Sequence, residues 1–260
     1  MSSPIITQQR DGVLHVCINR PEKRNALSMA TLDAIAAAFN HAANAADESD
    51  LRLAVLTGAG HKSFAAGGDL KELASVRGEQ AAIAMATHAK GALSAVRNFP
   101  LPVVAALNGD ALGGGAELAM ACDMRIAAHH ARIGFIQGKL GITSAWGGGV
   151  DLMRLIGTAA ALHMMTRMEV IEPSQACAMG LYNKVADDQT SLDDALEAFI
   201  APMRQQSPHV MRSFKAMALH LRQNNREEMD RLETHNFGRA WAHPDHDRAV
   251  ERLLSKTRAT

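Results

Sequence analysis

The sequence has no excess of charge of either sign. Its 260 residues include 27 lysines and arginines and 27 aspartates and glutamates, so the formal net charge is zero. A chain without net charge has no basic field that would hold nucleic acid or an anionic membrane surface. We therefore expect neither nucleic acid nor a membrane among its partners, and any phosphate group must be bound locally.

Long apolar runs and linkers are also missing. No run reaches the length that spans a bilayer, and residues 1–6 lack a charged segment followed by an apolar one. These absences favour a soluble protein with a cytoplasmic location. No Pro/Ser-rich linker divides the chain, so we expect one main domain with appendages.

Cysteine is scarce. Cys17, Cys122 and Cys177 are odd in number, widely spaced and set in apolar surroundings, which predicts buried reduced thiols and no disulfide framework. The histidine-rich segment His243–Asp247 fits no zinc spacing, and its proline and aspartates are typical of a turn and a helix start. We expect no metal.

Two common nucleotide-binding motifs are absent. Gly58-Ala59-Gly60 follows an apolar run, but the third glycine of a dinucleotide fingerprint is missing and Ser63 stands in its place. No Gly-Lys-Ser/Thr sequence occurs, so a nucleoside-triphosphate loop is not supported.

Apolar periodicity predicts an α/β fold. Strand patterns alternate with helical ones over the first half of the chain, which favours mostly parallel pairing. Strands are expected at residues 13–19, 51–57, 103–107, 124–128 and near 185, with a helix over 29–46 capped by Ser28 and a largely helical region over 192–254.

Two glycine-rich segments carry the clearest chemical signal. Phe64–Leu70 and Asn108–Leu118 each follow a strand pattern and open into a helical one, an arrangement typical of two backbone N–H donors that converge on an oxyanion. Glu117 lies in the first turn of the second helix, in apolar surroundings where a carboxylate is costly without a function or a partner. The alternative is that the glycines only allow close packing of helix on sheet. A third cluster, Gly147–Gly149, is interpreted as a loop reversal before a helix from Val150.

These segments resemble the crotonase superfamily of enoyl-CoA hydratases and isomerases. The resemblance extends over nearly the whole chain and is carried by Asn19-Arg20-Pro21, Asn25-Ala26-Leu27, Phe64–Leu70, Asn108–Asp123, Gly147-Gly148 and Gly180–Val185. It implies a spiral of ββα turns over residues 1–200 with the acyl-CoA site. It also implies a helical C-terminal region over 201–260 that assembles homotrimers, often paired into hexamers.

The resemblance also implies catalytic positions. The oxyanion donors would be the N–H groups of Gly68 and Gly114, and Glu117 matches the first of the two hydratase glutamates. Gln137 stands where the second glutamate is expected, and an amide cannot titrate. Because syn addition of water is usually shared between two carboxylates, hydration is expected to be slow.

The substrate implied is an acyl-CoA thioester, with coenzyme A part of the substrate and no other cofactor. Substrate-binding positions implied by the match are Lys23, Arg24, Ala26, Ala66, Gly68, Asp69, Leu70, Lys71, Gly114 and Trp146. Lys23 and Arg24 can equally belong to a solvated loop, Asp69 can be a helix N-cap, and Trp146 can be core packing. The walls of the acyl pocket are expected from loops, including residues 72–91.

Three functions remain open besides isomerisation, which the resemblance weakens because isomerases with one glutamate generally keep the second and not the first. A hydratase-type lyase is the commonest in the family. Decarboxylation of a short branched malonyl-CoA suits the single carboxylate, and Ile142–Gly148 is similar to the loop of ethylmalonyl-CoA decarboxylase-like members. A relative that binds acyl-CoA without catalysis, or serves as a structural oligomer, is the third, and Glu117 argues against it.

Overall fold

A six-stranded, mostly parallel sheet forms the centre of the protein. In the computed structural model, which describes residues 3–46 and 49–258, its strands run in the order β1-β2-β3-β5-β7-β10. Within this sheet, β1 and β2 pair in antiparallel fashion and the other neighbouring strands are parallel. The strands are β1 (Ile5–Arg10), β2 (Val13–Ile18), β3 (Leu53–Gly58), β5 (Val103–Leu107), β7 (Met124–Ala127) and β10 (Lys184–Val185). β5 is buried throughout, as expected for a strand covered on both faces.

A second sheet brings the two glycine-rich segments together. It has the order β4-β6-β8-β9, with β4 (Ser63–Ala65), β6 (Asp110–Leu112), β8 (Ile133–Gly134) and β9 (Val170–Ile171). β4 and β6 are parallel neighbours, so their carboxyl ends lie at the same edge of this sheet. Each glycine-rich segment overlaps one of these strands, and its glycines, Gly67-Gly68 and Gly113–Gly115, come just after the strand, so they meet at that edge.

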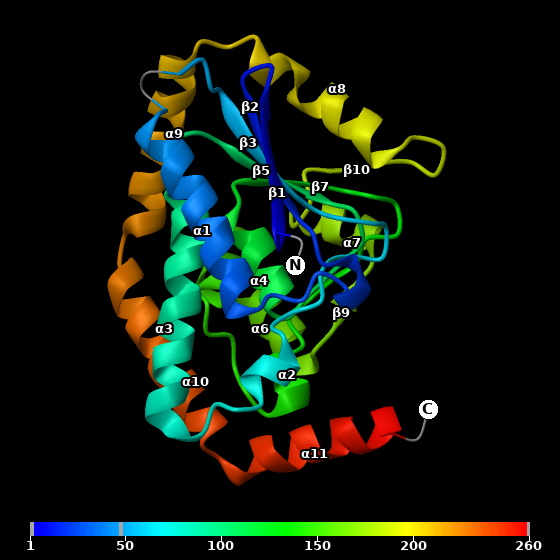
Figure 1. Ribbon diagram of the computed structural model, residues 1–260, viewed down its shortest axis with the longest axis vertical. Helices are drawn as coiled ribbons and strands as arrows, with labels where there is room; N and C mark the ends of the chain where they lie inside the picture. Colours follow the sequence, from blue (N-terminus) through cyan, green and yellow to red (C-terminus); the bar gives the residue numbers. More distant parts are fainter. Residues whose placement is uncertain (1–2, 47–48, 259–260) are drawn as a thin grey trace.

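Helices cover the sheets and form a long layer on one side (Figure 1). α3 packs between α1 and α10, and α11 packs against the short η2. The helices are α1 (Met29–Asn44), α2 (Leu70–Leu73), α3 (Gly78–Arg97), α4 (Gly114–Ala121), α5 (Gly148–Ile156), α6 (Thr158–Arg167), α7 (Pro173–Ala178), α8 (Leu192–Arg204), α9 (Pro208–Gln223), α10 (Arg226–Trp241) and α11 (Pro244–Arg258). Two short 3-10 helices are η1 (Pro21–Lys23) and η2 (Gln137–Leu140).

Most elements expected from the sequence are present. β2, β3, β5, β7 and β10 lie where strands were predicted, and α1 begins after Ser28, whose hydroxyl accepts a hydrogen bond from Thr31 N at 3.2 Å. α8 to α11 confirm the helical region after residue 192. The division at residue 200 stays a prediction, and residue 200 itself lies within α8. Met1, Ser2 and residues 259–260, the ends of the two predicted units, lie outside the described residues.

Three expectations are wrong. Residues 72–91 are not a loop, because α3 begins at Gly78 and packs its buried alanines against neighbouring helices. The Gly147–Gly149 cluster is not a loop before a helix from Val150, because α5 already begins at Gly148. Cys177 is exposed rather than buried, whereas Cys122 is fully enclosed and Cys17 is half-buried.

No helix within residues 3–46 and 49–258 combines the length and the apolar character needed to cross a membrane.

Candidate active site

Glu117 is buried in the first turn of α4 and is saturated with hydrogen-bond donors. Only 2 % of the residue is exposed. Its Oε2 accepts from Trp146 N at 2.8 Å and Gly148 N at 3.0 Å, and its Oε1 accepts from Ala145 N at 3.3 Å and Gln137 Nε2 at 3.0 Å. The positive end of the α4 dipole adds to these donors. The site therefore holds a carboxylate in a water-poor environment.

Burial raises the pKa of Glu117 from its ordinary 4.5 to about 7. The negative charge of Glu233 acts in the same direction, whereas the backbone donors at Trp146 and Gly148 oppose it. A carboxyl group with this pKa exchanges its proton at neutral pH, which is the property that a general acid or base requires.

Gln137 lies at the start of η2 and faces Glu117. A 3.0 Å hydrogen bond from Gln137 Nε2 to Glu117 Oε1 joins the two side chains. The amide donates to Glu117 through nitrogen, which leaves the Gln137 carbonyl oxygen as an acceptor beside the carboxylate.

The segment 144–148, three of whose amides donate to Glu117, is also bound by the carboxylate of Glu233 on α10. Glu233 Oε2 accepts from Gly147 N at 2.8 Å and its Oε1 accepts from Ser144 Oγ at 2.9 Å. Lys90 Nζ of α3 lies 3.1 Å from Glu233 Oε2 and compensates its charge. No sequence motif marks Glu233, which lies in a helix rich in charged residues, and sequence reasoning missed it.

Beneath this loop lies a buried ionic cluster that sequence reasoning also missed. Asp151 of α5 accepts from Arg97 Nε at 2.9 Å and Nη2 at 2.7 Å, and from Arg226 Nη1 at 2.6 Å. Arg226 Nη2 also donates to the Gly147 carbonyl at 3.0 Å. Both cations lower the pKa of Asp151, so it stays ionised although its residue is only 4 % exposed. The cluster fixes the start of α5 and the end of the loop that cradles Glu117.

Gly68 and Gly114 lie close together at the edge where β4 and β6 end. A Cβ added to Gly67 would lie 3.7 Å from Gly114 N, so the two glycine-rich segments are in contact. Gly67 and Gly113 have φ angles of +107° and +54°, in the region that favours glycine. Neither Gly68 N nor Gly114 N donates to another group among the residues that the structure describes. Within the described part of the chain, both N–H groups are therefore without a hydrogen-bond partner.

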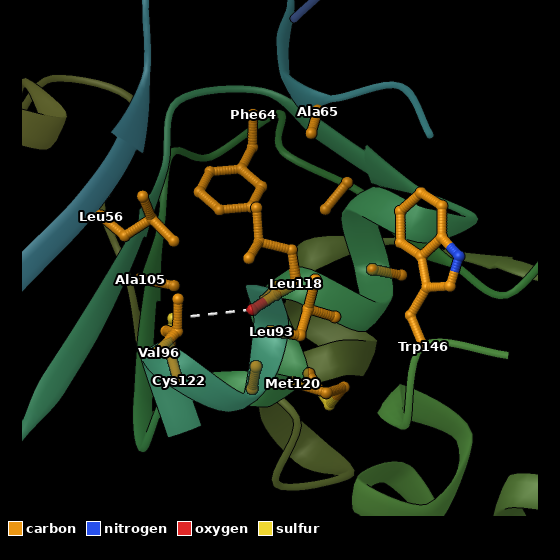
Figure 2. Close-up of a cluster of buried hydrophobic side chains, with 14 of the residues drawn as sticks. Leu56, Phe64, Ala65, Leu93, Val96, Ala105, Leu118, Met120, Cys122 and Trp146 are labelled. Carbon is orange, nitrogen blue, oxygen red and sulfur yellow. Dashed lines mark hydrogen bonds between the residues drawn. The ribbon is translucent and has the colours of Figure 1, made fainter. Parts of the chain in front are cut away.

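Trp146 lies directly against both glycines. A Cβ added to Gly114 would be 2.2 Å from Trp146 Cζ3, and one added to Gly68 would be 3.4 Å from Cη2. The indole is almost enclosed, with 5 % of the residue exposed. Figure 2 shows it at one side of the buried cluster that contains Phe64 and Leu118. It is thus part of the core, one of the two interpretations that the sequence left open, and also a neighbour of the two glycines; its role as a substrate-binding residue stays a prediction.

The loop after β2 runs beside the first glycine-rich segment. Ala66 N donates to the Arg24 carbonyl at 3.1 Å, Leu27 N to the Gly67 carbonyl at 2.8 Å, and Asp69 N to the Leu27 carbonyl at 3.0 Å. The structure therefore brings Lys23, Arg24 and Ala26 to Ala66, Gly68 and Asp69, as the sequence match implies.

Asp69 precedes α2, but its side chain makes no capping hydrogen bond. The carboxylate instead pairs with Arg20 at 2.8 Å and lies 3.8 Å from Lys23 Nζ, and Arg20 lowers its pKa. Leu70 and Lys71, in the same short helix, are exposed. An apolar and a cationic side chain are thus presented to solvent beside the glycine-rich edge.

Comparison with known proteins agrees with this geometry. The sequence model described as "Enoyl-CoA hydratase/isomerase" matches residues 8–259. A crotonyl-CoA hydratase of Syntrophomonas wolfei is 34% identical, with 98% of this chain and 96% of the relative covered. An ethylmalonyl-CoA decarboxylase of Xenopus laevis is 27% identical, covering 91% and 78%. A crystal structure of an enoyl-CoA hydratase from Bacillus anthracis is 31% identical, covers 88% of this chain and 90% of the other, and superimposes with a TM-score of 0.77.

The family match, the α/β architecture and the paired glycine-rich segments lead to one assignment. The chain belongs to the enoyl-CoA hydratase/isomerase family, within the crotonase superfamily.

Proposed function

We propose that the protein is a lyase that adds water across the 2,3 double bond of a trans-2-enoyl-CoA. The observation that carries this proposal is the buried carboxylate of Glu117, which accepts four hydrogen bonds and whose pKa burial raises to about 7. Beside it the N–H groups of Gly68 and Gly114 lie unused at one sheet edge. Hydratases at 34% and 36% identity support the same reaction class.

In the proposed reaction, the thioester oxygen accepts hydrogen bonds from Gly68 N and Gly114 N. Ionised Glu117 takes a proton from water while the water oxygen bonds to C3, and the electron pair of the double bond moves into the enolate. Protonated Glu117 then returns that proton to C2. Each oxyanion donor is worth about 3–4 kcal/mol to the developing charge. The Gln137 amide orients the water through its free carbonyl oxygen and takes no proton, so the step relies on one titrating group.

The proposed binding mode places the CoA moiety along the edge formed by Lys23, Arg24 and Ala26 and by the segment 66–71. Their side-by-side arrangement and the exposed cations of Lys23 and Lys71 support it. Coenzyme A enters as part of the substrate, and the reaction as written uses no further cofactor.

A homotrimer or a dimer of trimers is part of the proposal. Phe214, Met217 and Leu221 lie on one face of α9 and are 64 %, 68 % and 71 % exposed. An apolar face of this kind is stabilised when another subunit covers it. The cytoplasmic location expected from the sequence stays a prediction.

Decarboxylation of a branched malonyl-CoA is the second candidate, favoured by the presence of Gln137 where a second carboxylate would be expected. Loss of carbon dioxide leaves its electron pair on C2 as the enolate, and protonated Glu117 supplies the proton that C2 then needs. The single carboxyl group suffices for this sequence of steps. The sequence identity to the crotonyl-CoA hydratase of Syntrophomonas wolfei, 34%, is greater than the 27% identity to the ethylmalonyl-CoA decarboxylase of Xenopus laevis.

Mass spectrometry of CoA products tests both reactions. Wild type and Glu117→Gln would be incubated with crotonyl-CoA and, in parallel, with ethylmalonyl-CoA, and butyryl-CoA affinity would be measured for both proteins. We expect wild type to add water to crotonyl-CoA, and Glu117→Gln to lose about 100-fold or more of that rate while keeping its affinity. Loss of carbon dioxide with crotonyl-CoA untouched would replace hydration by decarboxylation. No change in the mass of either thioester with wild type or variant, together with retained butyryl-CoA affinity, would indicate a protein that binds without catalysis, whereas an active wild type with an equally active variant would show that Glu117 is not the catalytic group.

A further inference from the structure

The space next to Gly68 and Gly114 is filled by side chains. On the side of Gly114 lies the benzo ring of Trp146, with Cζ3, Cη2 and Cε3 at 2.2, 2.7 and 2.8 Å from the Cβ position. On the side of Gly68 lie Trp146 Cη2 at 3.4 Å and Leu73 Cδ1 at 2.7 Å from the corresponding position. One rigid ring therefore bridges the two glycines whose N–H groups are unused.

The backbone that carries this ring is held on both sides. Trp146 N donates to Glu117, and the next amide, Gly147 N, donates to Glu233. Ala145 N and Gly148 N are bonded to Glu117 as well. Because four successive N–H groups are fixed by two carboxylates, the Cα of Trp146 cannot shift without loss of several buried hydrogen bonds. The backbone is thus fixed and the indole itself is almost enclosed, so the ring forms a wall of the site.

A wall in this place acts on the acyl group of a substrate. A thioester whose oxygen lies between Gly68 N and Gly114 N has its C2 and C3 atoms within a few bond lengths of the glycines. An acyl chain that continues past C4 must then pass the ring. Overfilling a packed interior is costly, because buried side chains already lie in van der Waals contact.

We infer that Trp146 limits the length of the acyl chain, so that the site accepts groups of crotonyl size and excludes long chains. This inference rests on the proposed acyl-CoA function and adds its substrate class. It treats Trp146 as a specificity-determining residue. A tryptophan that served only the core would affect stability and leave the preference among substrates unchanged.

The test compares chain lengths in binding and in turnover. Dissociation constants for butyryl-CoA and octanoyl-CoA, which carry no double bond to hydrate, would be measured by calorimetry for wild type, Trp146→Ala and Trp146→Leu. Rates of hydration of crotonyl-CoA and trans-2-octenoyl-CoA would be measured in parallel. Trp241→Phe, at the chain's other tryptophan on α10, is the matched control, because Trp241 packs against Phe237 and His246.

We expect wild type to prefer the four-carbon ligand, and Trp146→Ala to shift the octanoyl-to-butyryl affinity ratio about tenfold or more toward the longer chain. Trp146→Leu leaves a smaller cavity than Trp146→Ala and should give an intermediate shift of the affinity ratio. It also serves as the test variant if Trp146→Ala does not fold. Trp241→Phe should leave the ratio as in wild type.

The inference is overturned by equal affinity of wild type for both chain lengths, or by an unchanged octanoyl-to-butyryl affinity ratio in folded Trp146 variants. If wild type selects butyryl-CoA and both variants shift the ratio, yet no enoyl-CoA is hydrated, the proposed hydration is wrong and the inference stands. If wild type binds neither thioester, both are wrong.

Discussion

Gln137 Nε2 donates a hydrogen bond to Glu117 Oε1 at 3.0 Å, so an amide occupies the place beside the carboxylate where hydration would use a second acid or base. This pairing keeps the amide oriented but removes one proton exchanger from the site. Substitution of Gln137 therefore measures how much a carboxyl group at this position would add to the rate of hydration.

Gln137→Glu should raise the rate of crotonyl-CoA hydration about 10-fold or more, because a positioned acid or base typically contributes about 10²–10⁴-fold. Two adjacent carboxyl groups cannot both ionise at low cost, so one of them holds a proton at neutral pH. The measurement is kcat for wild type, Gln137→Glu and Gln137→Met. The methionine variant is the control, since it removes the hydrogen bond without adding a carboxyl group. A glutamate variant no faster than the methionine variant would show that this position does not handle protons.

How far the site was predictable depends on whether its parts are neighbours in the chain. Glu117 and the glycines Gly68 and Gly114 carry local signals, namely a strand, a glycine-rich turn and an apolar helix start. Their convergence follows from the parallel pairing of β4 and β6. Strand β5 and the Ser28 cap were predictable for the same local reasons.

The missed parts depend on contacts between distant segments. Glu233 reaches the loop from α10, 86 residues along the chain from Gly147, and nothing in its own helix distinguishes it from the exposed glutamates nearby. The partners of Asp151 come from α3 and α10. Tertiary contacts thus supply what local patterns do not encode. Residues 78–97 of α3, by contrast, carry a local helix signal, because alanine is a strong helix former, and the loop interpretation of residues 72–91 overlooked it.

The pH dependence of turnover separates the two candidate reactions. The pKa of Glu117 lies near 7, and hydration needs the ionised form as base. The rate of hydration should therefore rise as pH increases through about 7 and level off above it. Decarboxylation needs protonated Glu117, so its rate should fall over the same interval. The measurement is kcat at saturating substrate between pH 5.5 and 8.5, in mixed buffers of constant ionic strength, a range about 1.5 units either side of the pKa. A flat profile would mean that Glu117 does not titrate in the rate-limiting step.

Removal of the Glu233 carboxylate should shift the pH dependence of turnover. The charge of Glu233 raises the pKa of Glu117, so Glu233→Gln should lower that pKa and shift the midpoint of the rate profile to lower pH. Glutamine keeps a carbonyl acceptor for one of the two loop donors, Ser144 Oγ and Gly147 N. Glu228→Gln on the same helix is the control, because Glu228 is exposed. If both variants left the midpoint where it is in wild type, Glu233 would serve the loop only mechanically.

The buried cluster around Asp151 should dominate the stability of this region. Asp151→Ala leaves Arg97 and Arg226 without their shared anion, and breaking a buried pair in this way typically costs about 3–5 kcal/mol. Urea unfolding at pH 7 measures the loss, with exposed Asp188→Ala expected within about 0.5 kcal/mol of wild type.

The sign of its pH dependence follows from the lowered pKa of Asp151. A carboxylate with a depressed folded pKa contributes stability that is complete above the unfolded pKa of 3.8 and is lost as pH falls through the folded value. The difference between wild type and Asp151→Ala should therefore shrink below pH 3.8. A difference that grew on acidification would contradict an ionised Asp151.

Gly114→Ala and Gly115→Ala should both lower stability and butyryl-CoA affinity. The two effects have different causes, which the additional substitution Trp146→Ala distinguishes. The added methyl group at Gly114 meets the indole of Trp146 at 2.2 Å, whereas at Gly115 it meets the backbone carbonyl oxygen of Ala65 at 2.0 Å. A side chain can be removed and a carbonyl cannot. Trp146→Ala should therefore restore much of the stability and butyryl-CoA affinity of Gly114→Ala and do nothing for Gly115→Ala. Thermal unfolding and calorimetry of the four single and double variants, each compared with Trp146→Ala alone, measure the coupling. Equal rescue at both glycines would mean that the indole does not lie against Gly114.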